Sequence, residues 1–159
     1  MRKLNVSLLS HDEVDRAYPL VQAIQPAATI DAWRRFAKGR LEGTAARDMG
    51  ILSVRNEQDY IVGIGAYILA QDLLHGPILF ADHFCALDIM DKSGVARALL
   101  RGMERLAEQK GCSAIHTTLA QAAIIENSDW MSNVLHERGH CVRGLQMCKL
   151  IPAASRTNA

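Results

Sequence analysis

The sequence predicts a single α/β domain in which a mixed sheet is flanked by helices. Two observations carry this prediction. The chain has 159 residues, of which 49% are hydrophobic and 22% charged, the size and balance of one compact globular domain. Strand-like runs in the middle give way to a strand–helix–strand unit, which places two parallel strands in the sheet. We expect the domain to cover residues 1–152 and a flexible tail to follow at 153–159.

The first part of the chain predicts one strand followed by two helices. Residues 4–9 form a short strand-like run. Ser10 and Glu13 match the S-x-x-E pattern of a capping box, which begins a helix. Pro19 must kink this helix or begin a new turn. Thr29 is positioned to cap the second helix.

The middle of the chain is rich in predicted strands. Residues 50–55 and 60–70 flank a polar turn and form an expected hairpin, and residues 78–87 form the next strand. Gly63 and Gly65 lie inside the second of these runs. No helix follows them, so they indicate a bulge or close backbone packing rather than a phosphate-binding loop.

The second half continues with a long amphipathic helix. Apolar residues recur at helical period over residues 94–110. Residues 112–119 read as a buried strand, a helix begins at Ser128 and Asp129, and residues 145–151 are expected to form the last strand.

Composition excludes several classes of function. The net charge is +1, with 18 basic and 17 acidic residues, so no basic face for nucleic acid is expected. No run approaches the roughly 20 apolar residues of a membrane span. The four cysteines have no framework or zinc spacing, which favours reduced thiols and a cytoplasmic location. His136 and His140 are four apart, but Gly139 interrupts the helix between them, so no metal site is expected.

The segment with the clearest chemical meaning runs from the strand at 78–87 into the long helix. A helix that begins directly after a central strand presents free backbone N–H groups and the positive end of its dipole. This arrangement favours an anionic or nucleotide-like ligand. An ordinary strand–helix connection is the alternative.

The order of elements resembles that of the GNAT acetyltransferases over nearly the whole chain. In that family the loop before the long helix reads Arg/Gln-x-x-Gly-x-Gly/Ala, and residues 91–96 here read DKSGVA. Gly94 and Ala96 match the pattern, whereas Asp91 puts a negative charge where the family has a basic or neutral group. The resemblance implies a mostly antiparallel mixed sheet flanked by helices, with acetyl-CoA as co-substrate.

The resemblance also implies which residues hold the cofactor. Backbone groups at the end of the strand before the helix would pair with the pantetheine, and loop amides would hold the pyrophosphate. The matching positions are Cys85, Ala86, Leu87, Lys92, Ser93, Gly94, Val95, Ala96 and Arg97.

Asp82 is the predicted general base. Many GNAT enzymes carry a carboxylate or histidine twelve residues before the loop glycine, and Asp82 occupies that position relative to Gly94. Partial burial would raise its pKa toward a useful range. The alternative is a structural aspartate bonded to neighbouring backbone. Strand alternation would turn His83 to the opposite face.

The chain departs from the family pattern at the residue that would protonate the leaving thiolate. GNAT enzymes often carry a tyrosine on the last helix, and Leu135 occupies the matching position here. Ser128 and His136 are the candidates for that role, with water as a further alternative.

These patterns predict an acetyl-CoA-dependent N-acetyltransferase that acts directly on the amine of a small molecule or protein. One alternative is a GNAT-fold domain that binds acyl-CoA for regulation with little or no catalysis. Another is an α/β binding domain unrelated to CoA. Residues 27–47 would line the acceptor region. Its arginines Arg34, Arg35 and Arg40 are expected to belong to a solvated surface, and the alternative is a basic rim that suits an acidic acceptor. The oligomeric state stays open, with a homodimer the commonest symmetric assembly.

Overall fold

The protein is built on one five-stranded mixed sheet. A computed structural model describes residues 3–87, 91–119, 129–144 and 146–150. Within these residues the strands lie in the order β1-β2-β3-β4-β5. The pairs from β1 to β4 are antiparallel, whereas β4 and β5 run parallel, which confirms the predicted mostly antiparallel mixed sheet. The strand bounds are Asn5–Leu8 for β1, Met49–Arg55 for β2, Ile61–Asp72 for β3, Gly76–Ala86 for β4 and Ala114–Thr117 for β5.

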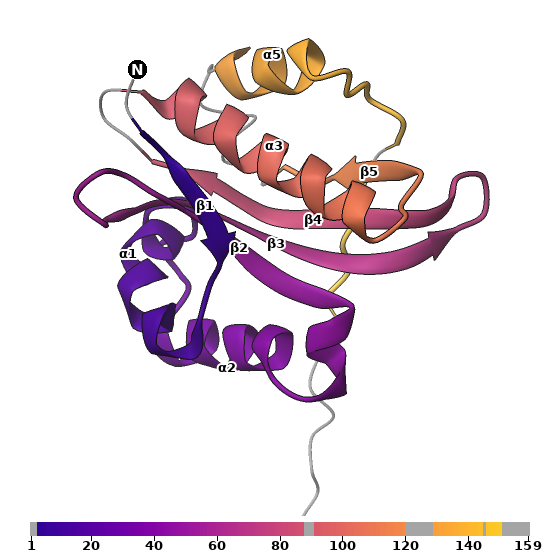
Figure 1. The fold of residues 1–159 in the computed structure, drawn as a ribbon. Helices are drawn as coiled ribbons and strands as arrows, with labels where there is room; N and C mark the ends of the chain where they lie inside the picture. The colour runs from indigo at the N-terminus through magenta and orange to yellow at the C-terminus, as the bar shows by residue number, and fades with distance from the viewer. Residues whose placement is uncertain (1–2, 88–90, 120–128, 145, 151–159) are drawn as a thin grey trace, which may run out of the picture.

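Helices cover both faces of this sheet (Figure 1). The first two, α1 (Val14–Ile24) and α2 (Ile30–Leu41), lie on one face, and α3 (Lys92–Gln109) and α5 (Asp129–Glu137) lie on the other. Two short 3-10 helices, η1 (His11–Glu13) and η2 (Thr44–Arg47), precede α1 and β2. No helix in the described part of the chain is long and apolar enough to cross a membrane.

Local capping explains where the N-terminal helices begin. The predicted capping box is confirmed: the Glu13 carboxylate accepts the Ser10 amide at 3.1 Å. Thr29 caps α2 and accepts the amide of Ala32 at 3.2 Å. Pro19 lies inside α1. Both predicted helix starts therefore hold, because the side chains satisfy backbone donors that a helix leaves unpaired.

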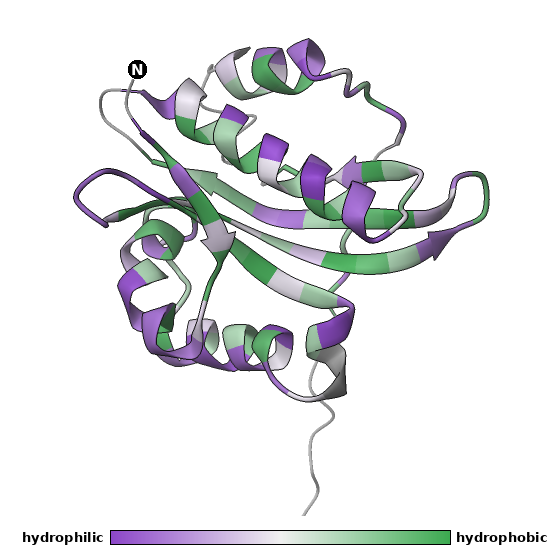
Figure 2. Ribbon diagram, viewed as in Figure 1, coloured by the Kyte–Doolittle hydropathy of each residue, from purple (hydrophilic) through white to green (hydrophobic). Residues whose placement is uncertain are grey.

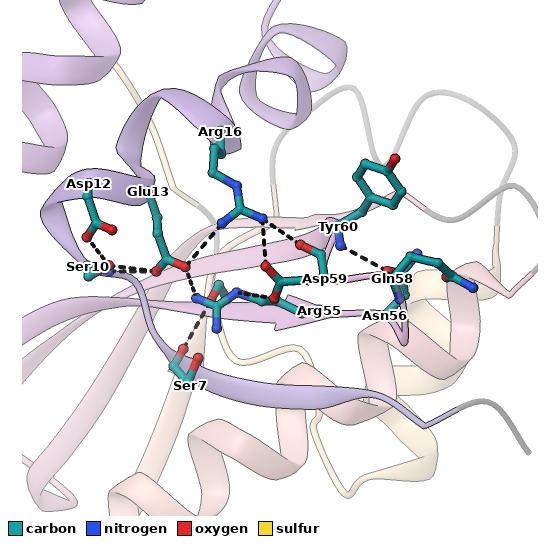
Figure 3. A network of polar contacts seen from close by, with 11 residues as sticks. Ser7, Ser10, Asp12, Glu13, Arg16, Arg55, Asn56, Gln58, Asp59 and Tyr60 are labelled. Atoms are coloured by element: carbon teal, nitrogen blue, oxygen red, sulfur yellow. Dashed lines mark hydrogen bonds and ion pairs between the residues drawn. The ribbon is translucent and has the colours of Figure 1, made fainter.

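A polar network ties the start of α1 to the β2–β3 hairpin (Figure 3). Glu13 pairs with Arg55 of β2, and both side chains are largely buried. Arg16 of α1 donates to the Asp59 carboxylate at 3.0 Å. Each charge has an opposite partner, so the network fixes the orientation of α1 relative to the sheet.

The core fills the space on both sides of the sheet. Figure 2 shows apolar residues along the strands, with polar residues on the outer side of α3. The α3 side of the core includes Leu79, Ala81, Phe84, Leu99 and Met103. The other side is filled from α1 and α2, by Trp33 and Ala37 among others.

Two strand glycines let α3 approach the sheet closely. A Cβ on Gly63 would lie 2.7 Å from Cγ1 of Val95, and one on Gly65 would lie 2.4 Å from Cε of Met103. Both positions therefore have room only for hydrogen, which confirms the close packing expected from the sequence.

The strand predicted at residues 145–151 is absent from residues 146–150, the part of it that the structure describes. Residues 146–150 have no strand structure, and Met147 and Leu150 are 88% and 87% exposed. Apolar spacing alone does not make a strand, because the ladder of hydrogen bonds requires a neighbouring strand. None of the described strands pairs with this segment.

Candidate active site

A bulge in β4 is the centre of the candidate site. Ile64 of β3 pairs with Cys85, and Ala66 pairs with Asp82. One residue of β3 therefore lies opposite two of β4, His83 and Phe84. His83 has a φ of 48°, in the left-handed region that non-glycine residues seldom adopt. Such bulges re-aim side chains and are common beside active sites.

Because of this bulge, the side chain of His83 has a different orientation from the one predicted. Strand alternation placed its side chain on the face opposite Asp82. Instead, His83 Nδ1 lies 3.3 Å from Asp82 Oδ2, and the His83 ring lies 4.6 Å from the Phe36 ring of α2. The extra residue shifts the alternation by one position, so Asp82 and His83 share the α2 side of the sheet.

Arg40 completes this cluster from α2. Its Nη2 donates to Asp82 Oδ2 at 2.9 Å, and its Nη1 donates to the carbonyl of Tyr67 at 3.0 Å. Its guanidinium also lies 4.8 Å above the Phe36 ring. Arg40 is only 9% exposed, so the expectation that it belongs to a solvated surface is wrong. Its buried ion pair with Asp82 explains the difference.

The pKa of Asp82 also differs from the prediction made from the sequence. Burial raises the pKa of Asp82, but hydrogen bonds and charge from His83 and Arg40 outweigh it, and the net pKa lies below the usual value. The raised pKa predicted from the sequence followed from burial alone, without Arg40 and His83. Among the described residues, the buried Oδ1 of Asp82 has no hydrogen-bond partner, although buried acceptors are normally satisfied.

The end of β4 is free of β5. Parallel pairing ends where Ala81 meets Thr117, and the amide of Thr118 donates to the Ala81 carbonyl at 2.9 Å. Residues 82–86 of β4 continue without a described strand on that side. The parallel pairing of β4 with β5 therefore ends next to Asp82.

The three strand-end residues have different surroundings. Cys85 is buried against α1, and burial raises its thiol pKa to about 12, so it is a core residue and not a nucleophile. Ala86 packs on the α3 side. Leu87 borders a hollow of about 470 Å³, whose other lining residues are Arg16, Pro19, Leu20, Tyr60 and Ile61.

The N-terminus of α3 is capped by Asp91. Its Oδ1 accepts the amide of Gly94 at 2.8 Å. A Cβ on Gly94 would lie 1.9 Å from Asp91 Oδ2, so glycine is needed for this carboxylate to approach. The Asp91 carboxylate, which departs from the family pattern, therefore accepts a hydrogen bond from the Gly94 amide. This is one of the amides that we expected to hold the pyrophosphate.

The other loop residues divide between surface and core. Lys92 is exposed and Ser93 half-buried. Val95 and Ala96 are fully buried, so only their backbone could meet a ligand. Arg97 donates to the Glu137 carboxylate of α5 at 2.8 Å and 3.1 Å.

Of the two proposed thiolate donors, only His136 is among the described residues, and it lies on the other side of the sheet from Asp82. Ser128 is outside the described residues. His136 is exposed on α5, which lies on the α3 side of the sheet (Figure 1), and its Nδ1 lies 3.0 Å from the His140 carbonyl. His140 reaches the point where β4 and β5 separate: its Nδ1 is 3.5 Å from Thr117 Oγ1. Burial lowers the pKa of His140.

Known proteins resemble this chain in structure but not detectably in sequence. No family model and no curated protein matches it. An aminoglycoside N-acetyltransferase in complex with CoA superposes with a TM-score of 0.70 at 15% identity, covering 98% of this chain and 97% of the other. A ribosomal-protein-alanine N-acetyltransferase from Brucella melitensis biovar Abortus 2308 gives 0.71 at 13% identity, covering 94% and 100%.

The chain has the GNAT fold. A third structure agrees: glucosamine-6-phosphate N-acetyltransferase from Arabidopsis thaliana, with a TM-score of 0.69 at 12% identity, covers 94% of this chain and 99% of the other. Neither the burial of Arg40 nor the orientation of His83 was predicted from the sequence. The basic residue four positions after Phe36 was visible in the sequence, but nothing there indicated burial.

Proposed function

We propose that the protein is an acetyl-CoA-dependent N-acetyltransferase that transfers the acetyl group directly to the amine of a small molecule or protein. The observation that carries this proposal is the Arg40–Asp82–His83 cluster at the point where β4 leaves β5. Acetyltransferases that share the fold have been crystallised with CoA or a bisubstrate CoA analogue, which supports the same co-substrate here.

The acetyl-CoA site that we propose combines the open strand edge with the start of α3. The backbone of Cys85, Ala86 and Leu87 would pair with the pantetheine. The amides of residues 92–97 would hold the pyrophosphate, because the start of a helix favours anions. Lys92 would add a positive charge at the exposed side of this loop.

The Asp82–His83 pair is our candidate for removing the proton from the substrate ammonium. A carboxylate with a lowered pKa is a weak proton acceptor, since a base works best when its pKa is near the working pH. Histidine is the side chain that most often serves as a general base, and the side chain of His83 is 49% exposed. We therefore propose that His83 accepts the proton and that Asp82 holds the His83 ring in one orientation.

The reaction balances without a further reactant. The neutral amine attacks the thioester carbon, the C–S bond breaks, and CoA leaves as a thiolate. His83 first takes one proton from the ammonium to give the neutral amine. After the N–C bond forms, the nitrogen loses a second proton to water, and the thiolate gains one proton from a donor or from water. Ser128 and His136 remain our candidates for that donor.

His83→Gln and Asp82→Asn test the pair. With acetyl-CoA and a panel of amines, thiol release should fall by roughly 10²–10⁴ in His83→Gln, the usual contribution of a positioned base. The loss should shrink at high pH, where more amine is already neutral. Asp82→Asn should slow turnover and shift the pH profile while acetyl-CoA still raises the melting temperature. His11→Gln, an exposed histidine beside Glu42, is the matched control. Full activity in a folded His83→Gln would remove His83 from the mechanism.

An acyl-CoA-binding domain with little catalysis is the second candidate. Leu135, at the position where the family often carries the tyrosine that protonates the thiolate, favours it, because binding without turnover needs no such donor. The Asp91 carboxylate on the Gly94 amide opposes an incoming pyrophosphate and would weaken CoA binding in either candidate. Both candidates predict that acetyl-CoA stabilises the fold, by about 2.7 kcal/mol at a hundredfold excess over Kd. Only the enzyme releases free CoA with an amine. No stabilisation by acetyl-CoA would contradict both.

A further inference from the structure

A cluster of two histidines and one carboxylate lies at the hairpin end of β4. Asp72 ends β3, His75 precedes β4, and His116 lies on β5. All three side chains are partly buried. None of them belongs to the proposed acetyl-transfer site, which begins farther along β4 at Asp82.

The donor atoms of this cluster converge on one point. His75 Nδ1 lies 3.1 Å from His116 Nε2 and 3.2 Å from Asp72 Oδ1. The three donor atoms all lie within 4.8 Å of one another. Two ligands of a tetrahedral zinc ion are about 3.4 Å apart, given metal–ligand distances of about 2.0–2.2 Å. An ion between these atoms would therefore require shifts of only a few tenths of an ångström on two of the three edges.

The rings are arranged so that their nitrogens meet. The His75 and His116 rings are perpendicular, at 89°, with centroids 5.2 Å apart. In this arrangement Nδ1 of His75 and Nε2 of His116 face each other at 3.1 Å. A direct hydrogen bond satisfies only one nitrogen as acceptor and one as donor, while a metal ion would accept a lone pair from both.

The carboxylate is already held in place by the turn. Asp72 Oδ1 accepts the amides of Leu74 and His75 at 2.9 Å and 2.8 Å. Metal-ligating carboxylates typically have hydrogen bonds of this kind that orient them.

We propose that Asp72, His75 and His116 form a three-ligand site for a divalent transition-metal ion of the Zn²⁺ class, with a fourth position open to solvent. Two imidazoles with one carboxylate suit zinc and its neighbours, whereas calcium and magnesium prefer oxygen ligands alone. Binding would join the β3–β4 turn to β5, the strand at the end of the described sheet. The proposal does not depend on the acetyltransferase activity.

Sequence spacing could not reveal this site. His116 is 41 residues from His75, and no short motif relates them. The parallel pairing of β5 with β4 brings them together, and that pairing is a property of the fold.

Metal binding to untagged, chelator-treated protein tests the proposal. Titration with Zn²⁺ should give one ion per chain, and Co²⁺ should give the visible absorption of a tetrahedral site. Zn²⁺ should also raise the melting temperature, while Mg²⁺ and Ca²⁺ should not. His116→Gln and His75→Gln should each weaken Zn²⁺ binding at least tenfold, since even residues around a metal site change affinity by about 10–100-fold.

Two further variants make the result specific. Asp72→Asn keeps an oxygen for the two turn amides but removes the charge, so it should fold normally and bind Zn²⁺ less tightly. His11→Gln removes an exposed histidine elsewhere and should bind as the wild type does. The proposal is overturned if the wild type binds no Zn²⁺, or if all three ligand variants keep wild-type affinity. If His116→Gln does not fold, the Zn²⁺ affinities of His75→Gln and Asp72→Asn test the proposal in the same way.

Discussion

Replacing Asp91 with asparagine should tighten acetyl-CoA binding. Asp91 Oδ1 lies 2.8 Å from the Gly94 amide, so a pyrophosphate oxygen bound near that amide would approach a negative charge. Two unit charges about 4 Å apart in water repel each other by about 1 kcal/mol. A pyrophosphate with about two charges near Asp91 therefore loses about 2 kcal/mol, and removing this repulsion should lower Kd by about 10- to 30-fold.

The stability of the same variant should change in the opposite direction. Asparagine caps a helix about as well as aspartate, so α3 keeps its first turn. The favourable interaction of a negative charge with the helix dipole is lost, which costs about 0.3–1 kcal/mol. Asp91→Asn should therefore melt slightly lower without ligand and gain more from acetyl-CoA than the wild type does.

Calorimetric titration with acetyl-CoA, paired with thermal unfolding, measures both effects. Asp31→Asn is the matched control, because it removes the same charge from the exposed first turn of α2. It should leave Kd unchanged. The difference between Asp91→Asn and the wild type should narrow as salt is added. Unchanged or weaker binding in a folded Asp91→Asn would mean that the pyrophosphate does not use this end of α3.

Further predictions concern the buried pair and the packing of α3. The lowered pKa of Asp82 stabilises the fold above the unfolded carboxyl pKa of about 3.9, and this stabilisation is lost as pH falls through the folded pKa. Arg40→Met should cost about 3 kcal/mol near neutral pH, and this cost should shrink as pH falls and Asp82 is protonated, as urea unfolding followed by circular dichroism would measure. Gly63→Ala should cost more than Gly65→Ala in urea unfolding, because Gly63 faces the stiff Val95 side chain and Gly65 a flexible methionine tip. Equal costs would contradict this packing.

The fold was largely predictable because its signals are local. The Ser10 capping box, the Thr29 cap and the helical period of α3 each specify an element without knowledge of the rest. Parallel pairing around α3 follows from the strand–helix–strand order. The strand expected at 145–151 rested on apolar spacing alone, and residues 146–150 show that such spacing needs a partner strand to become a ladder.

The site was only partly predictable because its chemistry depends on pairing between distant segments. Asp82 stood out as a carboxylate in an apolar strand, and it does lie where β4 separates from β5. Its partner Arg40 is 42 residues away, so the sign of the pKa shift could not be read from the strand. The orientation of His83 depends on one extra residue in β4 relative to β3, which only the register reveals.

Both charged residues that matter most for the proposed activity are already satisfied by the protein itself. Asp82 is held by Arg40 and His83, and Asp91 is held by the Gly94 amide. The first arrangement helps catalysis, because a fixed carboxylate can keep the His83 ring in one orientation. The second opposes it, because acetyl-CoA must replace or share the capping bond, which is worth about 1 kcal/mol. In the proposed activity, the chain would therefore combine a preorganised pair, Asp82 and His83, with a loop whose Gly94 amide already binds the Asp91 carboxylate. Its affinity for acetyl-CoA should accordingly respond to a change at Asp91 and its turnover to a change at His83, each with little effect on the other.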